Sequence, residues 1–421
     1  MFVFGSATFA TAQELQPVDH PEQLGFDPAR LQRLTEVYQG YVDRGELPGA
    51  VLLVARADQI AYVRAIGYQD REKQIPMNVD SIFRIASMTK PIVAVAAMML
   101  VEEGRLDLAA PVAKYLPQIG EMKVGVEQTD PATGKPVLKL EPQQTVMRIQ
   151  DLMRHTSGFI YGSFGDRLVH QAYRAAGLFA AGDTLAETIT KLSKLPLAHQ
   201  PGEVWEYGLS FDVLGRVVEV VSGMDLDRFI AERITRPLHM PATDFYVHEA
   251  DLSRVAEPQI DAATGKRPPT PDVAKRPSAL SGGGGLLATA ADYLRFSEML
   301  LHGGAFGGVR LLSPHTVALM TSNALPPGVG FTELAATFVD LAPTPAMGQG
   351  FGLGMAVRTA AGHNPTPASV GTFYWTGSWG TTFWVDPQEK LIGIEMIQVP
   401  IAVSGPYRRV FRELVYQALM D

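Results

Sequence analysis

A serine and a lysine three residues apart are the first side chains of this chain that could carry out chemistry together. They occur in the stretch RIASMTK (84–90), which places Ser87 three residues before Lys90. A helix would bring both side chains onto one face. An amine held neutral by its surroundings can take the proton of a serine hydroxyl and make the serine a nucleophile. The ordinary alternative is a helix-capping serine followed by a solvated lysine.

The residues after Ser87 favour the catalytic interpretation. Residues 92–101 read IVAVAAMMLV, which is apolar on every side and predicts a helix buried at the centre of the protein. Lys90 then enters the interior, where desolvation disfavours the charged amine. Pro91 is compatible with this helix because the N–H groups of a first turn lack helical partners. The helix N-terminus would also place N–H groups and positive potential at Ser87.

Other catalytic arrangements find little support in the sequence. The G-x-S-x-G motif of α/β-hydrolases does not occur, and its nearest fragments, at 162–165 and 377–380, have the wrong spacing. The absence of cysteine excludes thiol nucleophiles and Cys-ligated metals. The nine histidines contain no H-x-x-x-H or H-E-x-x-H pair, so no metal site is predicted. The glycine run at 282–285 lacks the residues of a phosphate loop, so no cofactor is predicted either.

A serine–lysine pair needs a second proton handler and a site for the oxyanion. Tyr207 precedes an apolar helix and is either a packing residue or a phenolate-type base held by Lys90. The backbone N–H groups of Ser87 and Ser378 could bind the oxyanion. The stretch YWTGSWG (374–380) is a short strand with small residues that substrate could approach closely. Its candidate substrate-binding residues are Trp375, Thr376, Gly377 and Trp379, and its plain alternative is a glycine bend with core tryptophans.

The elements that must position these residues are strands at both ends of the chain and helices between them. Hairpins are expected over 49–68, turning at 57–59, and over 381–397, turning at Asp386-Pro387. Helices are expected over 289–304, capped by Thr289, and over 407–419. Residues 105 to about 325 offer few strand signals.

These elements predict an α/β (α+β) fold in which an antiparallel sheet is flanked by terminal helices and carries an inserted helical domain. Residues 13–95 together with 330–421 form the predicted sheet domain, and residues 96–329 form the mainly helical domain. The active site is expected in the cleft between the two domains.

Composition limits the partners of this chain. The net charge is −8 and no basic stripe occurs, so binding to nucleic acid or to an acidic membrane is not expected. No run of 18 uncharged apolar residues predicts a membrane span. Residues 1–12 are apolar and end in Ala10-Thr11-Ala12, like a clipped export signal, but a basic n-region is missing. Both cytoplasm and periplasm remain open, and the oligomeric state is not predicted.

The order S-x-x-K, Y-x-x, x-T-G resembles the serine β-lactamase and penicillin-binding-protein superfamily. The likeness runs from about residue 20 to the end. The stretches similar to the class C β-lactamase-like branch are FRIASMTK (83–90), DLMRHTSGF (151–159), PGEVWEY (201–207), SGGGGLLATAADYLRFSEMLL (281–301) and FGLGM (351–355).

Two departures from the class C pattern indicate the branch. The tyrosine motif ends in Leu209 where class C β-lactamases have Asn, and Trp375 replaces the lysine of K-T-G. That lysine helps to hold a substrate carboxylate, so an anionic substrate loses an anchor and a neutral ester loses nothing. Trp375 and Trp379, with Tyr374 and Phe373, would form an apolar wall instead. The chain therefore looks like a family VIII carboxylesterase.

The resemblance implies an acyl-enzyme mechanism for short-chain esters without a cofactor. Ser87 attacks the carbonyl, and Lys90 and Tyr207 together take its proton, with the direct base left open. Tyr207 then protonates the leaving alcohol, and water releases the acid. The alternatives are a class C-like β-lactamase or a D-aminopeptidase/DD-peptidase, then an acyltransferase or a non-catalytic binding protein. His155, although it follows Arg154 in RHTSG, is expected to be structural.

Overall fold

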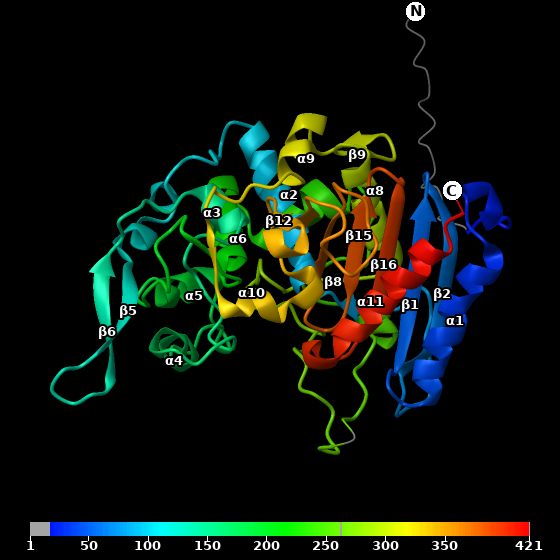
Figure 1. The fold of residues 1–421 in the computed structure, drawn as a ribbon, viewed down its shortest axis with the longest axis horizontal. Coiled ribbons are helices and arrows are strands. Elements are labelled where there is room, and N and C mark those ends of the chain that lie inside the picture. The colour runs from blue at the N-terminus through cyan, green and yellow to red at the C-terminus, as the bar shows by residue number, and fades with distance from the viewer. Residues whose placement is uncertain (1–16, 262, 421) are drawn as a thin grey trace, which may run out of the picture.

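The computed structural model describes residues 17–261 and 263–420, so the signal-like stretch at 1–12 lies outside the described residues. Eight antiparallel strands form one sheet with the order β12-β13-β14-β15-β16-β1-β2-β3 (Figure 1). Its strands are β1 (Gly49–Arg56), β2 (Gln59–Asp70), β3 (Ile75–Pro76), β12 (Gln349–Phe351), β13 (Ala356–Arg358), β14 (Phe373–Thr376), β15 (Thr382–Asp386) and β16 (Leu391–Ile397). The sheet thus combines the two ends of the chain, as the sequence predicts.

The pairing of β1 with β16 joins the N-terminal strands to the C-terminal ones. The register runs from Ala50 opposite Ile397 to Arg56 opposite Leu391. Both strands are apolar nearly throughout, and all but the last residue of β1 is buried. Strands buried on both faces read as continuous hydrophobic runs because each face packs on helices.

Helices cover both faces of this sheet. Helices α1 (Pro28–Asp43) and α11 (Ile401–Gln417) pack side by side on one face (Figure 1). Helix α8 (Ala290–Leu301) packs on the other face, against β1, β15 and β16. The sheet is therefore the middle of three layers, which buries the apolar side chains of β1 and β16 from both sides.

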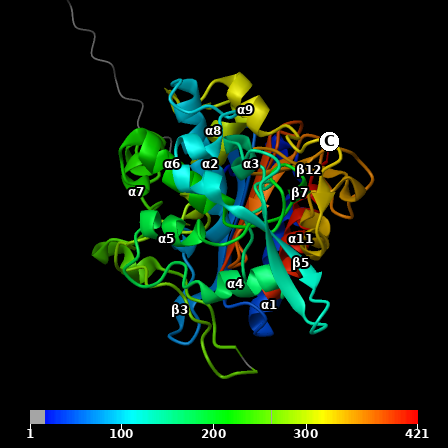
Figure 2. The same ribbon diagram turned by 90° about the vertical axis from the view of Figure 1, so that its left-hand side faces the viewer.

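The remaining helices form a second region beside the sheet (Figure 2). They are α2 (Thr89–Glu102), α3 (Ile149–Met153), α4 (Leu168–Ala175), α5 (Leu185–Leu192), α6 (Ser210–Ser222), α7 (Leu226–Ile230), α9 (Pro314–Met320) and α10 (Glu333–Thr337). Helix α2 is buried along nearly its whole length, as its apolar sequence predicts, and packs against α6. None of the helices in the described part of the chain is long and apolar enough to cross a membrane.

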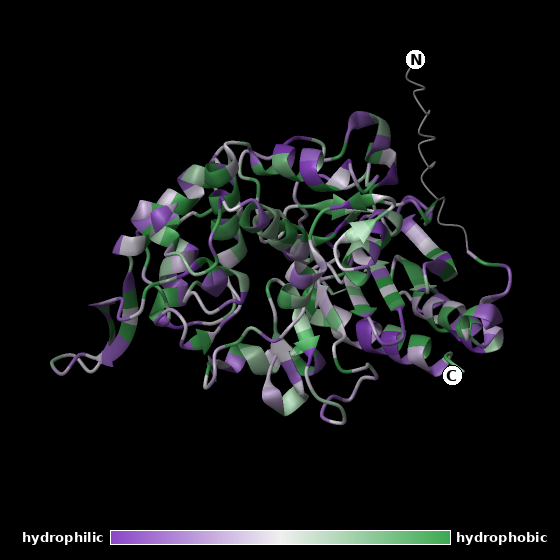
Figure 3. Ribbon diagram, turned by 90° about the horizontal axis from the view of Figure 1, so that it is seen from above, coloured by the Kyte–Doolittle hydropathy of each residue, from purple (hydrophilic) through white to green (hydrophobic). Residues whose placement is uncertain are grey.

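A hairpin of strands β5 (Lys123–Thr129) and β6 (Pro136–Pro142) lies inside the stretch that the sequence interprets as helical segments and loops. The hairpin projects from the body of the molecule, and many of its residues are hydrophilic (Figure 3). An exposed strand lacks the continuous apolar run that marks β1, so its signal in the sequence is weak. Six short strands form three further pairs, which are β4 (Phe83–Arg84) with β8 (Leu287–Ala288), β7 (Val204–Trp205) with β11 (Gly330–Phe331), and β9 (Ala305–Phe306) with β10 (Val309–Arg310).

The element boundaries agree with the sequence in three places and differ in one. Thr289 caps α8 by accepting a hydrogen bond from the Asp292 N–H, and the hairpins turn where expected. Helix α11 begins at Ile401, six residues before the expected start, and continues through Pro406. The expected start followed the proline because a proline usually ends a helix. The division into residues 13–95 with 330–421 and residues 96–329 stays a prediction.

The sheet generates a test of its packing. A Cβ at Gly393 would lie 2.2 Å from Trp384 Cζ2, and this ring packs against Phe411 and beneath the Arg412 guanidinium. We expect Gly393→Ala to lower the free energy of unfolding by about 1–3 kcal/mol, because overpacking displaces the ring. Denaturant unfolding measures the effect. Gly40→Ala is the matched control, since its Cβ meets only the flexible Arg44 side chain; equal stability of the two variants would contradict the packing argument.

Candidate active site

Ser87 lies at the point where a 3₁₀ turn, Ala86–Met88, leads into helix α2. Ala86 has φ +44°, in the left-handed region that residues other than glycine rarely adopt. Lys90 is fully buried in the first turn of α2, and its Nζ lies 3.1 Å from Ser87 Oγ. The expected pair is therefore assembled on one helix face. Backbone strain of this kind gathers at functional sites.

The amine of Lys90 has two other hydrogen-bond partners. Its Nζ lies 2.6 Å from the Gly283 carbonyl oxygen and 3.2 Å from the Tyr161 hydroxyl. Burial lowers the pKa of Lys90 to about 7, so about half of the amine is neutral at neutral pH. A neutral amine has two N–H groups and one lone pair. Since the Gly283 carbonyl can only accept, donation to Gly283 and Tyr161 leaves the lone pair free for the Ser87 hydroxyl.

Asp212 and Tyr161 are site residues that the sequence analysis missed. Asp212, in the first turn of α6, is buried and accepts hydrogen bonds from Ser281 Oγ at 2.6 Å and from the Gly283 N–H at 3.2 Å. Its charge raises the pKa of Lys90 and so opposes the effect of burial. The available signal for Asp212 was a carboxylate within an otherwise apolar helix start, which must be paired when buried.

The glycine run at 282–285 has a packing role at this cluster. A Cβ at Gly283 would lie 2.6 Å from Asp212 Oδ2 and 3.0 Å from the Tyr161 hydroxyl. A Cβ at Gly282 would lie 2.4 Å from the Phe211 carbonyl oxygen. These glycines let the backbone come close enough to bind both Lys90 and Asp212, which explains a motif that does not fit a phosphate loop.

Tyr207 lies between β7 and α6, and its hydroxyl faces Ser87 and Trp375. Trp375 Nε1 donates a hydrogen bond of 3.2 Å to this hydroxyl. Burial raises the pKa of Tyr207, although hydrogen bonds with Ser87 and Trp375 act in the opposite direction. Lys90 Nζ lies over the Tyr207 ring, 4.5 Å from its centroid, and its hydrogen bonds go to other groups. The geometry thus differs from the expected phenolate held by Lys90, because the amine contacts the ring face.

His155 lies behind Tyr207 rather than beside Ser87. Its ring centroid is 4.7 Å from that of Tyr207, and its other ring neighbours are Trp205, Phe211 and Phe351. Neither ring nitrogen has a hydrogen-bond partner among the described residues. Burial lowers the pKa of His155 well below its usual value, so the ring is neutral. The side chain packs against the tyrosine, in agreement with the structural interpretation.

The end of β14 lies directly against the turn that carries Ser87. A Cβ at Gly377 would lie 2.4 Å from the Ile85 carbonyl oxygen, so only glycine allows this approach. The hydrogen bonds of the turn after β14 use the N–H groups of Gly377 and Gly380, and not that of Ser378. Ser87 and Ser378 both line the same cavity. The expectation that their N–H groups bind an oxyanion stays a prediction.

The cavity in front of Ser87 has a volume of about 810 Å³. Trp375, Thr376 and Trp379 line it, together with Leu209 at the position where class C β-lactamases have Asn. Residues 164–179 and residues 334–341 both contribute to its apolar wall. Their lining side chains include Phe164, Phe179, Leu334, Phe338 and Leu341. Ser210, next in the tyrosine motif, instead pairs its hydroxyl with Ser157 in the interior at 2.8 Å.

The structure corrects one expectation for β14, namely that Phe373 and Tyr374 belong to the apolar wall of the cavity. Tyr374 and Phe373 are buried and are not among the lining residues. Tyr374 points to the face opposite Trp375 because successive side chains of a strand alternate, whereas Phe373 shares the face of Trp375 but lies two residues further along β14. Tyr374 lies under the Arg412 guanidinium of α11. Arg408 of α11 also reaches this face, and its Nη1 donates a hydrogen bond of 2.8 Å to Thr376 Oγ1.

Positive charge thus borders the cavity although Trp375 has none. Arg408, Arg409 and Asp340 all line it, and Arg409 Nη1 lies 3.5 Å from Asp340 Oδ1. The lining therefore holds two guanidinium groups together with two carboxylates, those of Asp340 and Asp212. The sequence analysis missed these arginines because they come from the terminal helix, far from every motif.

Comparison with known proteins identifies the family. The β-lactamase family matches residues 34–416 of the chain. This chain belongs to the β-lactamase family.

Relatives of this β-lactamase-family chain include esterases. It is 32% identical over 426 residues to Esterase EstB of Burkholderia gladioli, covering 94% of this chain and 98% of EstB. It is 38% identical over 363 residues to Protein Rv1367c of Mycobacterium tuberculosis, covering 85% of this chain and 87% of that protein. The solved structure of EstCE1, a hydrolase with promiscuous acyltransferase activity, matches with a TM-score of 0.76 at 28% identity, covering 95% of this chain and all of EstCE1.

These comparisons confirm the predicted serine β-lactamase-like fold and the predicted membership of the superfamily in its family VIII branch. The β-lactamase family model and the matches cover most of the chain, so the likeness is not confined to the motifs.

The Lys90 surroundings predict how activity of this β-lactamase-family protein depends on pH. If the neutral Lys90 amine takes the proton of Ser87, kcat/KM should rise with pH, with a midpoint at about pH 7. Asp212 raises the pKa of Lys90, so Asp212→Asn should move this midpoint to lower pH. Hydrolysis of p-nitrophenyl butyrate between pH 5 and 9 measures both, with the surface variant Asp43→Asn as control. An unchanged midpoint in Asp212→Asn would mean that the rise of kcat/KM with pH is not caused by deprotonation of Lys90.

Proposed function

We propose that this protein is a serine carboxylesterase that hydrolyses short-acyl-chain esters through an acyl-enzyme on Ser87. The observation that carries the proposal is the fully buried Lys90 amine, 3.1 Å from the serine hydroxyl, with its N–H groups directed to other acceptors. Such an amine is a base for the hydroxyl proton rather than a cation for a substrate.

In the proposed first step Ser87 Oγ attacks the ester carbonyl while its proton passes to Lys90. Lys90 is favoured as the direct base because its pKa is about 7, whereas burial raises the pKa of Tyr207 and keeps the phenol protonated. The developing oxyanion accepts hydrogen bonds from the N–H groups of Ser87 and Ser378. The tetrahedral intermediate then collapses and the bond to the alcohol oxygen breaks.

The leaving alcohol takes a proton from the Tyr207 hydroxyl, which leaves a phenolate. The Lys90 ammonium, which holds the proton of Ser87, then gives up one proton to this phenolate, so both groups regain their starting protonation. Trp375 supports this role, because its indole N–H stabilises the tyrosine oxygen as that oxygen gives up its proton. Water then attacks the acyl-enzyme with the same two groups acting in reverse, and the acid leaves. No step in this scheme calls for a metal or an organic cofactor.

The shape and polarity of the cavity support small or aryl esters as substrates. Its lining is mostly apolar, and Trp375, Phe338 and Leu341 stand where an alkyl or aryl group would lie. The names of EstB and EstCE1 describe esterase and hydrolase activity, which agrees with this choice. EstCE1 is described as having promiscuous acyltransferase activity, so transfer of the acyl group to an acceptor other than water is a variant of the same chemistry.

A second candidate is hydrolysis of compounds that bear a carboxylate, such as β-lactams or acyl-peptides. The observation that favours it is Arg408, which binds Thr376 at the end of β14 and borders the cavity. Its guanidinium could bind a carboxylate through two hydrogen bonds and so take the place of the lysine of K-T-G, where this chain has Trp375. This candidate uses the same nucleophile and differs only in the anchor.

The ester proposal predicts a substrate preference. We expect kcat/KM for p-nitrophenyl butyrate to exceed that for a chromogenic cephalosporin by at least about tenfold, because the cavity wall is mostly apolar. Ser87→Ala should reduce ester turnover by about 10³-fold or more. A faster cephalosporin reaction would favour the second candidate, and an active Ser87→Ala variant would remove Ser87 as the nucleophile.

The contribution of Arg408 can be separated with a pair of substrates. We expect Arg408→Met to lower kcat/KM for a p-nitrophenyl ester with a terminal carboxylate on its acyl chain by about tenfold or more, because the guanidinium is the anchor. Turnover of the neutral ester of equal length should change less. Arg236→Met, which alters an arginine outside the cavity lining, serves as the control. Equal loss with both esters would show that Arg408 acts through the position of Thr376 alone.

A further inference from the structure

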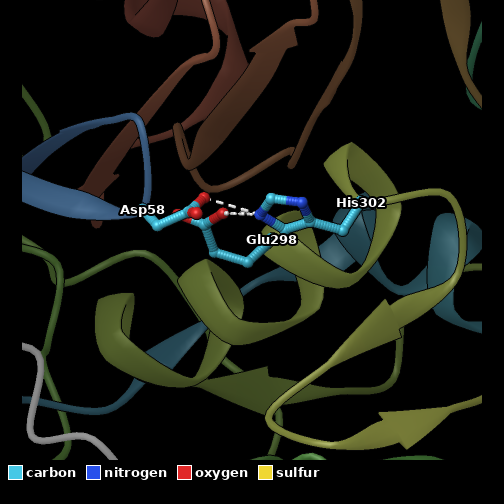
Figure 4. Close-up of side chains that lie close together, drawn as sticks. All are labelled: Asp58, Glu298 and His302. Atoms are coloured by element: carbon cyan, nitrogen blue, oxygen red, sulfur yellow. Dashed lines mark hydrogen bonds and ion pairs between the residues drawn. The ribbon is translucent and has the colours of Figure 1, made fainter.

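Three potential metal ligands converge where the turn between β1 and β2 meets the end of α8, outside the cavity that holds Ser87 (Figure 4). Asp58 lies in the turn, Glu298 on the last part of α8, and His302 at its C-cap. His302 Nε2 is 2.6 Å from Asp58 Oδ1 and 3.5 Å from Glu298 Oε2. One ligand atom from each residue lies within 4.8 Å of the other two.

Glu298 is the residue whose environment points to a ligand. Its side chain is only 2% exposed, and its Oε2, which faces the other two residues, makes no hydrogen bond to any described residue. Within the described part of the chain, no lysine or arginine forms an ion pair with Asp58 or Glu298. A buried carboxylate oxygen without a hydrogen-bond donor is costly, and the neighbouring carboxylate of Asp58 adds repulsion between like charges. A cation between these oxygens would remove both costs.

We propose that Asp58, Glu298 and His302 form a binding site for a divalent first-row transition metal, of which Zn²⁺ fits best. One imidazole nitrogen with two carboxylate oxygens is a donor set for such metals, whereas Mg²⁺ and Ca²⁺ prefer oxygen alone. Ligands of a tetrahedral Zn²⁺ lie about 3.3–3.5 Å apart. The separation of Glu298 Oε2 from His302 Nε2, 3.5 Å, already has this value.

The third ligand can reach its position with a small movement. The Asp58 side chain is 59% exposed and lies in a two-residue turn, so it is free to move. Its Oδ1 can give up the hydrogen bond with His302 Nε2 and move away until the two atoms are as far apart as two ligands of one metal ion. Three protein ligands leave a fourth position for water. The bound ion would tie the β1–β2 turn to α8, which come from parts of the chain 244 residues apart. Because the unfolded chain does not hold these ligands together, binding would stabilise the folded protein.

Zinc binding to the full-length protein tests the proposal. Protein treated with a chelator and then dialysed is titrated with ZnCl₂ by calorimetry, and its thermal midpoint is measured with and without Zn²⁺. We expect one equivalent to bind and the midpoint to rise. We expect His302→Gln and Asp58→Asn, both at partly exposed positions, to weaken binding at least tenfold and to remove the rise.

His315→Gln is the matched control, because it removes an exposed histidine of the next helix, α9, that lies outside the cluster. It should bind Zn²⁺ like the parent protein. The proposal is overturned if the parent protein binds no Zn²⁺ at micromolar concentration, in which case the three side chains form an ion pair only. It is equally overturned if His302→Gln binds as tightly as the parent.

Discussion

The burial of one amine is the constraint on which the site depends. Lys90 carries no exposed surface, yet its nitrogen must satisfy its hydrogen-bonding capacity inside the protein. Gly283, Tyr161 and Ser87 supply the partners from three separate parts of the chain. Asp212 adds the one negative charge that limits how far burial lowers the pKa of Lys90. The same arrangement that makes the lysine tolerable in the core thus sets its basicity near neutral pH.

Close backbone contacts hold these partners in place. Gly377 lies against Ile85, Gly283 against Asp212, and Gly208 against Phe159, and in each case a Cβ would fall 2.6 Å or less from another atom. The first contact brings the end of β14 to the turn before α2, and the other two join the segments that carry Gly283, Asp212, Tyr161 and Tyr207 to one another. The site is consequently built by the meeting of loops on rigid strands and helices, and its precision rests on residues that have no side chain at all.

The sequence predicts the Ser87–Lys90 pair and the main sheet, but it does not predict the exposed hairpin or several residues around the pair. The apolar run after Ser87 indicates burial of Lys90 directly, and long apolar strands at both ends indicate one sheet. The hairpin β5–β6 escapes prediction because its side chains face solvent. Asp212 and Tyr161 escape because their importance lies in contacts with residues 71 positions away, and Arg408 because it contacts Thr376 from 32 positions away; no local pattern records such contacts. The sequence indicates Trp375 as a lost charge and as part of an apolar wall that binds substrate, but it does not show that the indole N–H donates a hydrogen bond to Tyr207.

The pairing of β1 with β16 also has a consequence for how the molecule is made. Strand β1 leaves the ribosome more than 300 residues before β16. During most of synthesis β1 can therefore pair with β2 on one edge but has no partner on the other. Pairings so distant in sequence are slow to form, and an unpaired apolar strand edge invites association with other chains. The segment with Gly377 and Ser378, which depends on that sheet, completes the site only when the last strand is in place. The geometry around Ser87 is therefore completed only at a late stage of folding, when β16 has paired with β1.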